Sequence, residues 1–180
     1  NPFIATVSTG GLVTAVGNGT ATITATSGSV SGSASVTIAQ VASSVTLSPT
    51  SLSFSSLADT TTLTATVKDA DGSTISGATV TWSSSDTDIA TVSAAGLVTA
   101  VGNGTAIITA TSGSSSASAS VTVAQVASSV TLSPTSLSFS SLADTATLVA
   151  TVKDANDSTI ASPTVTWSST NTAVATVSSA

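Results

Sequence analysis

The sequence of 180 residues contains no cysteine and no histidine, and only two of its residues are basic. Without cysteine, the chain can form neither a disulfide nor a thiolate metal site. Without histidine, a serine nucleophile lacks its usual base. Two lysines cannot supply the basic face that binding to nucleic acid requires. We therefore expect no nucleic-acid partner and no catalytic, cofactor-binding or metal-binding residue.

Charged and aromatic residues are also scarce, at 6% and 3% of the chain. Hydrophobic residues make up 41%, which is enough for a buried core, so the composition does not predict disorder. No apolar run approaches the roughly 18 residues of a membrane helix, so we expect no membrane span in this segment. The chain begins without a signal-like stretch, and we expect it to be cut from a longer, extracellular protein.

The chain repeats itself at an offset of 85 residues. Residues 41–49 recur unchanged as residues 126–134, and residues 11–21 recur unchanged as residues 96–106. The repeats of solenoids are usually about 20 to 50 residues long. The longer period found here favours a row of separate domains.

The same offset sets the predicted domain boundaries. Residues 41–125 form one complete repeat, residues 1–40 the C-terminal part of another, and residues 126–180 the N-terminal part of a third. Such parts are marginal alone, so their apolar faces must be covered. Either the missing halves belong to the same polypeptide, or copies of the chain join head to tail. Residues 1–10 correspond to residues 171–180, and this overlap favours the first alternative.

Apolar and hydroxyl side chains alternate within each repeat, as they do in half-buried strands. Residues 62–67 alternate threonine with leucine, alanine and valine, and no segment shows the apolar stripe of a helix. Ile107 could face either way, but Thr22 stands at the equivalent position of another copy. We therefore predict that Ile107 faces water and that Ala106 and Ile108 face the core.

Turn signals separate the predicted strands. The Asn-Gly pairs at 18–19 and 103–104 predict hairpins, and the pairs at 71–72 and 156–157 also have turn chemistry. About seven short strands per repeat indicate a sandwich. The predicted fold class is all-β, with tandem immunoglobulin-like β-sandwiches of the antiparallel Greek-key type. The linker at 124–127 lacks glycine and proline, which predicts limited bending between repeats.

Several motifs in order resemble a known family. Trp82 and the SSSD that follows it, then residues 89–93 (IATVS), 96–101 (GLVTAV) and 104–106 (GTA), look like the bacterial Ig-like group 2 domain. This family is similar to the repeats of intimin and invasin stalks, of other surface adhesins and of some phage structural proteins. The resemblance covers the whole chain. It implies an Ig-like sandwich, no enzymatic activity and no shared functional residue.

The two lysines stand at predicted strand ends, each followed by an aspartate: Lys68–Asp69 and Lys153–Asp154. We expect solvated charges at both places. Chemistry between a serine and a lysine would need the lysine to be desolvated. An intramolecular isopeptide bond would in addition need a nearby acid, usually glutamate, and the chain has none. The lysines are therefore not predicted to be reactive.

The acidic residues form two candidate cation sites. Asp69 and Asp71 resemble part of a calcium loop, but calcium takes about six to eight oxygen ligands, and the next copy has Asn156 in place of Asp71. Asp86 and Asp88 are both replaced in the other two copies. A solvated turn is the preferred interpretation, and no metal is predicted.

Two further residue types are candidates for recognition. Asn18, Asn103 and Asn156 fit the N-glycosylation pattern, although a turn role explains the first two without sugar. Trp82 and Trp167 alternate with threonine, which predicts that they fill the core and do not stack on sugars.

The sequence therefore predicts a structural, extracellular array of Ig-like repeats that forms a stalk, fibre or filament on a bacterial surface. Its partners would be neighbouring repeats, or copies of itself joined head to tail. Two alternatives stay open. One is an adhesin module that binds a host receptor or surface glycan, with the divergent loops at 73–78 and 158–163 as its site. The other is an Ig-like domain of a phage tail or capsid.

Overall fold

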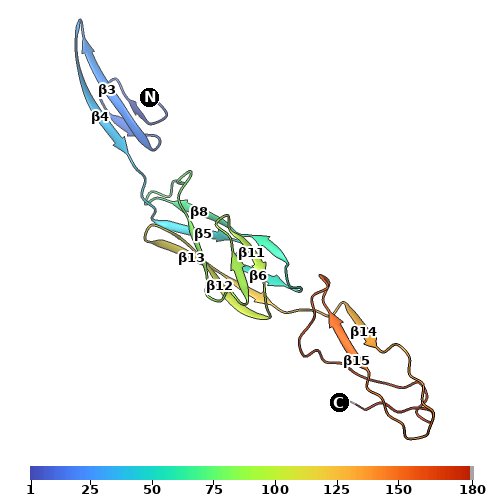
Figure 1. The fold of residues 1–180 in the computed structure, drawn as a ribbon. Helices are drawn as coiled ribbons and strands as arrows, with labels where there is room; N and C mark the ends of the chain where they lie inside the picture. The colour runs from blue at the N-terminus through green and yellow to red at the C-terminus, as the bar shows by residue number, and fades with distance from the viewer. Residues whose placement is uncertain (179–180) are drawn as a thin grey trace. The chain divides into compact units, whose positions relative to one another are not determined.

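A computed structural model describes residues 1–178, and these contain strands and no helix (Figure 1). The described residues therefore include no helix long and apolar enough to cross a membrane. The all-β prediction is confirmed. The chain divides into two compact units. One comprises Asn1–Thr46, Thr66–Val80 and Thr111–Ser116, and the other comprises Leu47–Ala65, Thr81–Ala110 and the described residues from Ala117 on. These units cross the predicted repeat boundaries, which stay a prediction.

Residues 1–40, here called the N-terminal segment, form two hairpins. Strand β1 (Ala5–Val7) pairs antiparallel with β2 (Val13–Ala15). Strand β3 (Gly19–Ser27) pairs antiparallel with β4 (Val30–Ile38) along its whole length. The turn between β3 and β4 uses Gly28 at φ 62°, a conformation that glycine adopts without steric cost.

Residues 41–125, the central segment, contain the most extensive pairing. Its strands are β5 (Ser44–Ser48), β6 (Ser51–Phe54), β7 (Thr60–Thr62), β8 (Thr64–Lys68), β9 (Thr81–Ser84), β10 (Ala90–Val92), β11 (Leu97–Ala100), β12 (Gly104–Ser112) and β13 (Ser115–Val123). One sheet has the order β10-β11-β7, a second has the order β6-β13-β12-β9, and β5 pairs with β8. The pairing of β6 with β13 is parallel, whereas β11 is antiparallel to both of its neighbours.

The C-terminal segment, residues 126–178, forms only one strand pair among its described residues. Strand β14 (Ser129–Ser133) pairs antiparallel with β15 (Val149–Lys153). These strands repeat β5 and β8 of the central segment. The counterparts of β6, β7, β9 and β10 have the same or nearly the same sequence but are not strands here.

The core lies in the central segment, where alternation places one side of each strand inward. Ile107 is exposed, while its neighbours Ala106 and Ile108 are buried, which confirms the predicted orientation of this strand. Two sheets that turn their apolar faces to a common interior form the sandwich that the alternation indicates. The buried apolar residues from both sheets and the connections between them include Leu52, Phe54, Leu63, Ala90, Val98, Ala100, Ala110, Ala119, Val121 and Val123.

Trp82 packs against the turn that joins β10 to β11. A Cβ on Gly96 would lie 2.9 Å from Trp82 Cζ2 and 2.5 Å from the carbonyl oxygen of Leu63. Gly96 also has a φ of 80°, so both the space and the backbone conformation require glycine. Trp82 is half-buried by this packing, and Trp167 is half-buried as well. Neither stands out in solvent.

The Asn-Gly pairs do not form the hairpins that the sequence predicted. Strand β11 precedes Asn103 and pairs with β10 and β7, whereas β12 follows it and pairs with β13 and β9. The chain therefore crosses from one sheet to the other at Asn103. In the N-terminal segment, Asn18 likewise stands between the pair β1–β2 and the pair β3–β4. The prediction was wrong because the strands on either side of each pair hydrogen-bond to other strands, and the asparagine side chains bond to glutamines 22 residues away.

Candidate functional site at the joints between segments

Gln125, in the linker after β13, is held by the preceding and the following segment. Its backbone N–H donates to Asn103 Oδ1 at 2.8 Å, and its side-chain oxygen accepts from Asn103 Nδ2 at 3.0 Å. On the other side, Gln125 Nε2 donates to Asp154 Oδ2 at 2.8 Å. We call Asn103, Gln125 and Asp154 the second joint. These residues lie in the same compact unit.

Asp154 is buried, with 2% of its surface exposed, and four groups donate to its carboxylate. Besides Gln125, the backbone N–H of Leu57 donates to Oδ2 at 2.9 Å. The backbone N–H groups of Asn156 and Ser158 donate to Oδ1 at 3.0 and 2.9 Å. A buried carboxylate is tolerated when its lone pairs are satisfied in this way. The expectation of a solvated charge at Asp154 was wrong, because the central segment covers it.

Asn156 adds a second bridge at this joint. Its Nδ2 donates to the carbonyl oxygen of Leu57 and to Asp59 Oδ1, both at 2.8 Å. Leu57 and Asp59 belong to the central segment, and Asn156 to the turn after β15. The turn that was predicted at 156–157 is present, and Asp157 takes a φ of 61° in it. Hydrogen bonds across the joint are thus donated by the central segment, through Leu57, and by the C-terminal segment, through Asn156.

The linker backbone is itself hydrogen-bonded, first to one segment and then to the other. The N–H groups of Ala124 and Val126 donate to the carbonyls of Phe54 and Ser55. Two residues later, the N–H of Ser128 donates to the carbonyl of Lys153 at 2.8 Å. The linker backbone therefore donates hydrogen bonds at Ala124, Val126 and Ser128.

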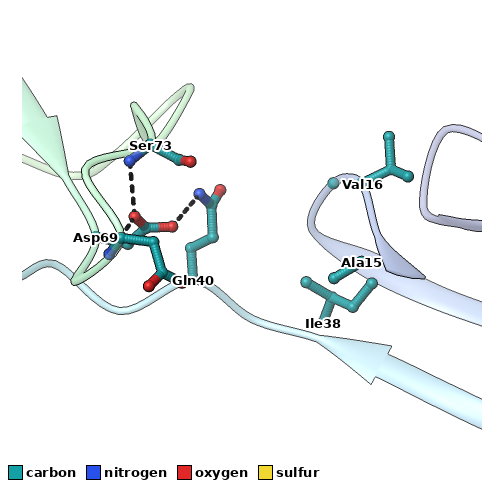
Figure 2. Close-up of a pocket in the computed structure, with 8 residues that line it drawn as sticks. Ala15, Val16, Ile38, Gln40, Asp69 and Ser73 are labelled. Carbon is teal, nitrogen blue, oxygen red and sulfur yellow. Dashed lines mark hydrogen bonds between the residues drawn. The ribbon is translucent and has the colours of Figure 1, made fainter. Parts of the chain in front are cut away.

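A matching set of residues, Asn18, Gln40 and Asp69, forms the first joint. Gln40 N–H donates to Asn18 Oδ1 at 2.6 Å, and Gln40 Nε2 donates to Asp69 Oδ2 at 2.8 Å. Figure 2 shows Asp69 accepting from both Gln40 and the backbone N–H of Ser73. Asp69 is half-buried here, and the described residues give it no partner equivalent to Leu57.

A pocket of about 190 Å³ opens beside the first joint. Figure 2 shows Ala15, Val16 and Ile38 on one side of it, with Gln40 and Asp69 opposite. Asp71 also lines the pocket, at the position that Asn156 occupies in the second joint. The pocket therefore has an apolar wall and an acidic wall.

The pKa values of both joint carboxylates are lowered from the ordinary value for aspartate. The amide of Gln40 lowers the pKa of Asp69, and backbone N–H groups add to this effect against the opposing effect of burial. Burial raises the pKa of Asp154, but the hydrogen bonds from Gln125, Leu57 and the turn outweigh it, so the net shift is downward. Both groups are therefore charged acceptors at neutral pH.

The other candidate sites are dispersed. Lys68 is exposed, and Lys153 Nζ lies 4.0 Å from Asp157 Oδ1 in an exposed pair that contributes little to stability. Asp86 and Asp88 are exposed in the turn before β10. Within residues 1–178, no group of three or more acidic side chains is placed so as to hold a metal ion.

The glycosylation pattern falls on side chains that the joints already use. The amide nitrogens of Asn18 and Asn103 donate to the two linker glutamines, and that of Asn156 donates across the second joint. Sequence reasoning missed the role of Gln40 and Gln125. A signal was available, because these are the only two glutamines in the chain and they occupy equivalent linker positions.

The strand order, the buried core and the joints define an immunoglobulin-like all-β module. The family model of the bacterial Ig-like domain (group 2) matches residues 1–38 and 41–123, and the chain belongs to this family. The resemblance of the motifs is thereby confirmed.

Among individual proteins, the chain is similar to ice-binding protein 1 of Shewanella frigidimarina (strain NCIMB 400). The two are 40% identical over 118 residues, which cover 64% of this chain and 13% of that protein. The chain therefore spans only a small part of the curated relative. Among solved structures, it is similar to the S-layer protein rSbsC(31-844), with 23% identity, 89% of this chain and 23% of that chain covered, and a TM-score of 0.45. Domains 4 and 5 of SbsC give 27% identity, coverage of 69% and 67%, and a TM-score of 0.44.

Proposed function

We propose that this chain is a structural module of a bacterial surface protein, in which Ig-like repeats are held in series to form a stalk, fibre or filament. The second joint carries this proposal. Gln125 is bonded to Asn103 on one side and to Asp154 on the other, at 2.8 to 3.0 Å. A linker side chain held at both ends resists rotation, so such a joint keeps neighbouring repeats in a fixed relation.

The mechanical role follows from how the bonds at the joint are arranged. The linker backbone continues without interruption from bonds with Phe54 and Ser55 to a bond with Lys153. It contains no glycine, which makes linkers flexible, and no proline, which makes them extended spacers. Pulling or bending at this place must break several hydrogen bonds together, which resists small loads better than a single contact does.

An extracellular, non-enzymatic role fits both the composition of the chain and the side chains of the second joint. A chain with six per cent charged residues, no cysteine and no histidine carries few of the groups that catalysis uses. The side chains of the second joint are engaged in hydrogen bonds with one another and with the backbone around them. The partners in this proposal are neighbouring repeats or further copies of the chain, and the outside of a bacterial cell is the location that membership of the family and the hydroxyl-rich surface favour.

The joint can be tested with two spin labels, because a chain without cysteine accepts labels only at introduced sites. Thr105→Cys on β12 and Thr131→Cys on β14 place one label on each side of the second joint, at exposed positions. Pulsed electron resonance at low protein concentration should give a narrow distance distribution. Gln125→Ala should broaden it, since both side-chain bonds are lost.

The matched control is Ser128→Ala, which removes an exposed side chain from the same linker and keeps the backbone bond to Lys153. This control should leave the distribution narrow. A broad distribution in the labelled parent chain, or no change on Gln125→Ala, would contradict the proposal. Specific micromolar binding of the chain on a glycan array would favour the adhesin alternative instead.

A further inference from the structure

Asn103, at the second joint, is followed directly by glycine. Among the asparagines of the chain, only Asn18 and Asn103 stand before glycine. Gly104 has a φ of 143°, and a Cβ placed on it would lie 2.6 Å from Ile89 Cδ1, so the structure favours glycine at this position. Without a side chain of its own, Gly104 leaves its backbone nitrogen open to the side chain that precedes it. The crossing between the two sheets therefore contains a reactive pair of residues.

An asparagine before glycine can modify itself. The backbone nitrogen of Gly104 loses its proton and attacks Cγ of Asn103. A C–N bond forms, the bond from Cγ to Nδ2 breaks, and Nδ2 takes up a proton and leaves as ammonia. Water then opens the resulting succinimide ring, which gives aspartate or isoaspartate, and isoaspartate lengthens the main chain by a methylene group. Water is the only co-reactant, and Asn103 is exposed to it.

Gln125 holds both polar atoms of the Asn103 side chain. Its backbone N–H donates to Oδ1 at 2.8 Å, and its Oε1 accepts from Nδ2 at 3.0 Å. The attack makes Cγ tetrahedral and moves it onto the nitrogen of Gly104, which displaces Oδ1 and Nδ2 from their planar arrangement against Gln125. The nitrogen that leaves is also one that Gln125 binds. The closed second joint therefore slows the reaction, and opening of the joint allows it.

The aspartate that results does not fit the hydrogen bonds of the joint. These bonds run in one direction, from Asn103 Nδ2 to Gln125 Oε1 and from Gln125 Nε2 to Asp154 Oδ2. An ionised carboxylate at position 103 has no hydrogen to donate, so it would face Gln125 Oε1. Turning the Gln125 amide over would satisfy this carboxylate, but it would point Oε1 at the buried Asp154. One glutamine amide therefore cannot serve a carboxylate at each end.

We propose that Asn103 is a self-modification site, which deamidates when the second joint opens and thereby weakens the joint permanently. The closed joint protects the residue, and the reaction replaces a hydrogen-bond donor by a charged acceptor. This goes beyond the proposed function and rests on it only for the closed state of the joint. Asn18 is the equivalent site at the first joint, because Gln40 holds it through bonds of 2.6 and 3.1 Å.

Peptide mass spectrometry of the full chain tests the protection. The chain is incubated at mildly alkaline pH in water enriched in heavy oxygen and digested in ordinary water, so that reaction before digestion is recognised by its isotope. Asn103 should react about tenfold faster in Gln125→Ala than in the parent chain, since both side-chain bonds of Gln125 are lost. Ser128→Ala changes an exposed side chain of the same linker and should leave the rate unchanged.

The two glutamines also serve as controls for each other. Gln40→Ala should accelerate the reaction of Asn18 and leave Asn103 unchanged, whereas Gln125→Ala should leave Asn18 unchanged. Asn156, which precedes aspartate, is the reference within the chain. Equal rates at Asn103 in the parent chain and in Gln125→Ala would overturn the protection. Reaction at Asn103 that is no faster than at Asn156 in Gln125→Ala would overturn the site itself.

The effect on the joint is measured with the spin labels at Thr105→Cys and Thr131→Cys. Asn103→Asp makes the aspartate product directly and should broaden the distance distribution across the second joint. Asn18→Asp makes the same chemical change at the first joint and should leave the distribution narrow. A narrow distribution in Asn103→Asp would refute the weakening of the joint.

The two proposals can fail separately. A narrow distribution in the labelled parent chain, together with no reaction at Asn103 in any variant, would leave the proposed function standing and reject only the self-modification. A broad distribution in the labelled parent chain would reject the proposed function, whatever the rate at Asn103.

Discussion

The central and C-terminal segments share a stretch of sequence that has two different structures. Residues 51–54 and 136–139 both read Ser-Leu-Ser-Phe. In the central segment, they form β6, and Phe54 is 7% exposed. In the C-terminal segment, they form no strand, and Phe139 is 48% exposed. The difference lies in β13, which pairs with β6 and has no counterpart in residues 126–178.

The N-terminal segment also shares residues with the central segment that differ in their burial. Val98 is fully buried, whereas Val13, in an identical stretch of eleven residues, is 39% exposed. The hairpin pairs β1–β2 and β3–β4 nevertheless form, because both strands of each pair lie in the segment. Pairing between strands that are neighbours in the chain is thus present in both segments, whereas burial of these valines depends on the strands that pack over them.

The largest difference in stability between the segments is expected on replacing the equivalent phenylalanines, Phe54 and Phe139. Phe54→Ala should destabilise the central segment by about 3 to 5 kcal/mol, because it leaves a cavity in a closed core. Phe139→Ala should cost about 1 kcal/mol or less, since half of the side chain already meets water. Urea unfolding can measure both, followed by the fluorescence of Trp82 for the first and of Trp167 for the second, with the other tryptophan replaced by phenylalanine. Equal losses would contradict the comparison.

The paired glycines should give the next largest difference. Gly96→Ala should cost about 3 kcal/mol, because the new Cβ meets the Leu63 carbonyl and the Trp82 ring at a positive φ. Gly11 has a φ of 84°, but nothing lies within 4 Å of the position that a Cβ would take. Gly11→Ala should therefore cost only about 1 to 2 kcal/mol of backbone strain. Thermal unfolding of the two variants checks this order.

A smaller change is expected from making the second joint resemble the first. Asn156→Asp removes the donor to Leu57 and places a carboxylate beside Asp59. Opening of the joint should become easier by about 1 to 2 kcal/mol. Hydrogen exchange of the Leu57 amide, which donates to Asp154, should therefore be roughly tenfold faster. An unchanged exchange rate would show that Asn156 is dispensable.

The smallest effect near neutral pH is expected from titration of the joints. The folded pKa values of Asp69 and Asp154 are both lowered, so their stabilising contribution is present above the unfolded pKa of about 4. It is lost as the pH falls through the lowered folded values. The spin-label distribution across the second joint should therefore stay constant from pH 8 to about pH 5 and broaden only in stronger acid. Broadening near pH 6 would point to a different group.

Much of the fold could be predicted from the sequence because it repeats itself. Alternation located the core strands, and the comparison of Ile107 with Thr22 gave the orientation of β12. The family followed from motifs in order. The Asn-Gly pairs misled, because the turn propensity of asparagine is local whereas its partner Gln125 is 22 residues away.

The joints could be predicted only in part. The sequence showed the position of the linker, its lack of glycine, and the equivalence of Asp69 and Asp154. The burial of Asp154 was not, because it depends on Leu57, 97 residues earlier in the chain. No local pattern around Lys153 and Asp154 distinguishes a solvated turn from a covered one.

The sequence by itself determined which residues can form strands, which side of each strand is apolar, and where the period places equivalent residues. Only the tertiary structure decided which of those strands form and which carboxylates are buried. The physical reason is that a strand is completed by hydrogen bonds to a neighbour, and a buried charge by donors that can come from any part of the chain. Identical residues therefore have different structures when their partners differ.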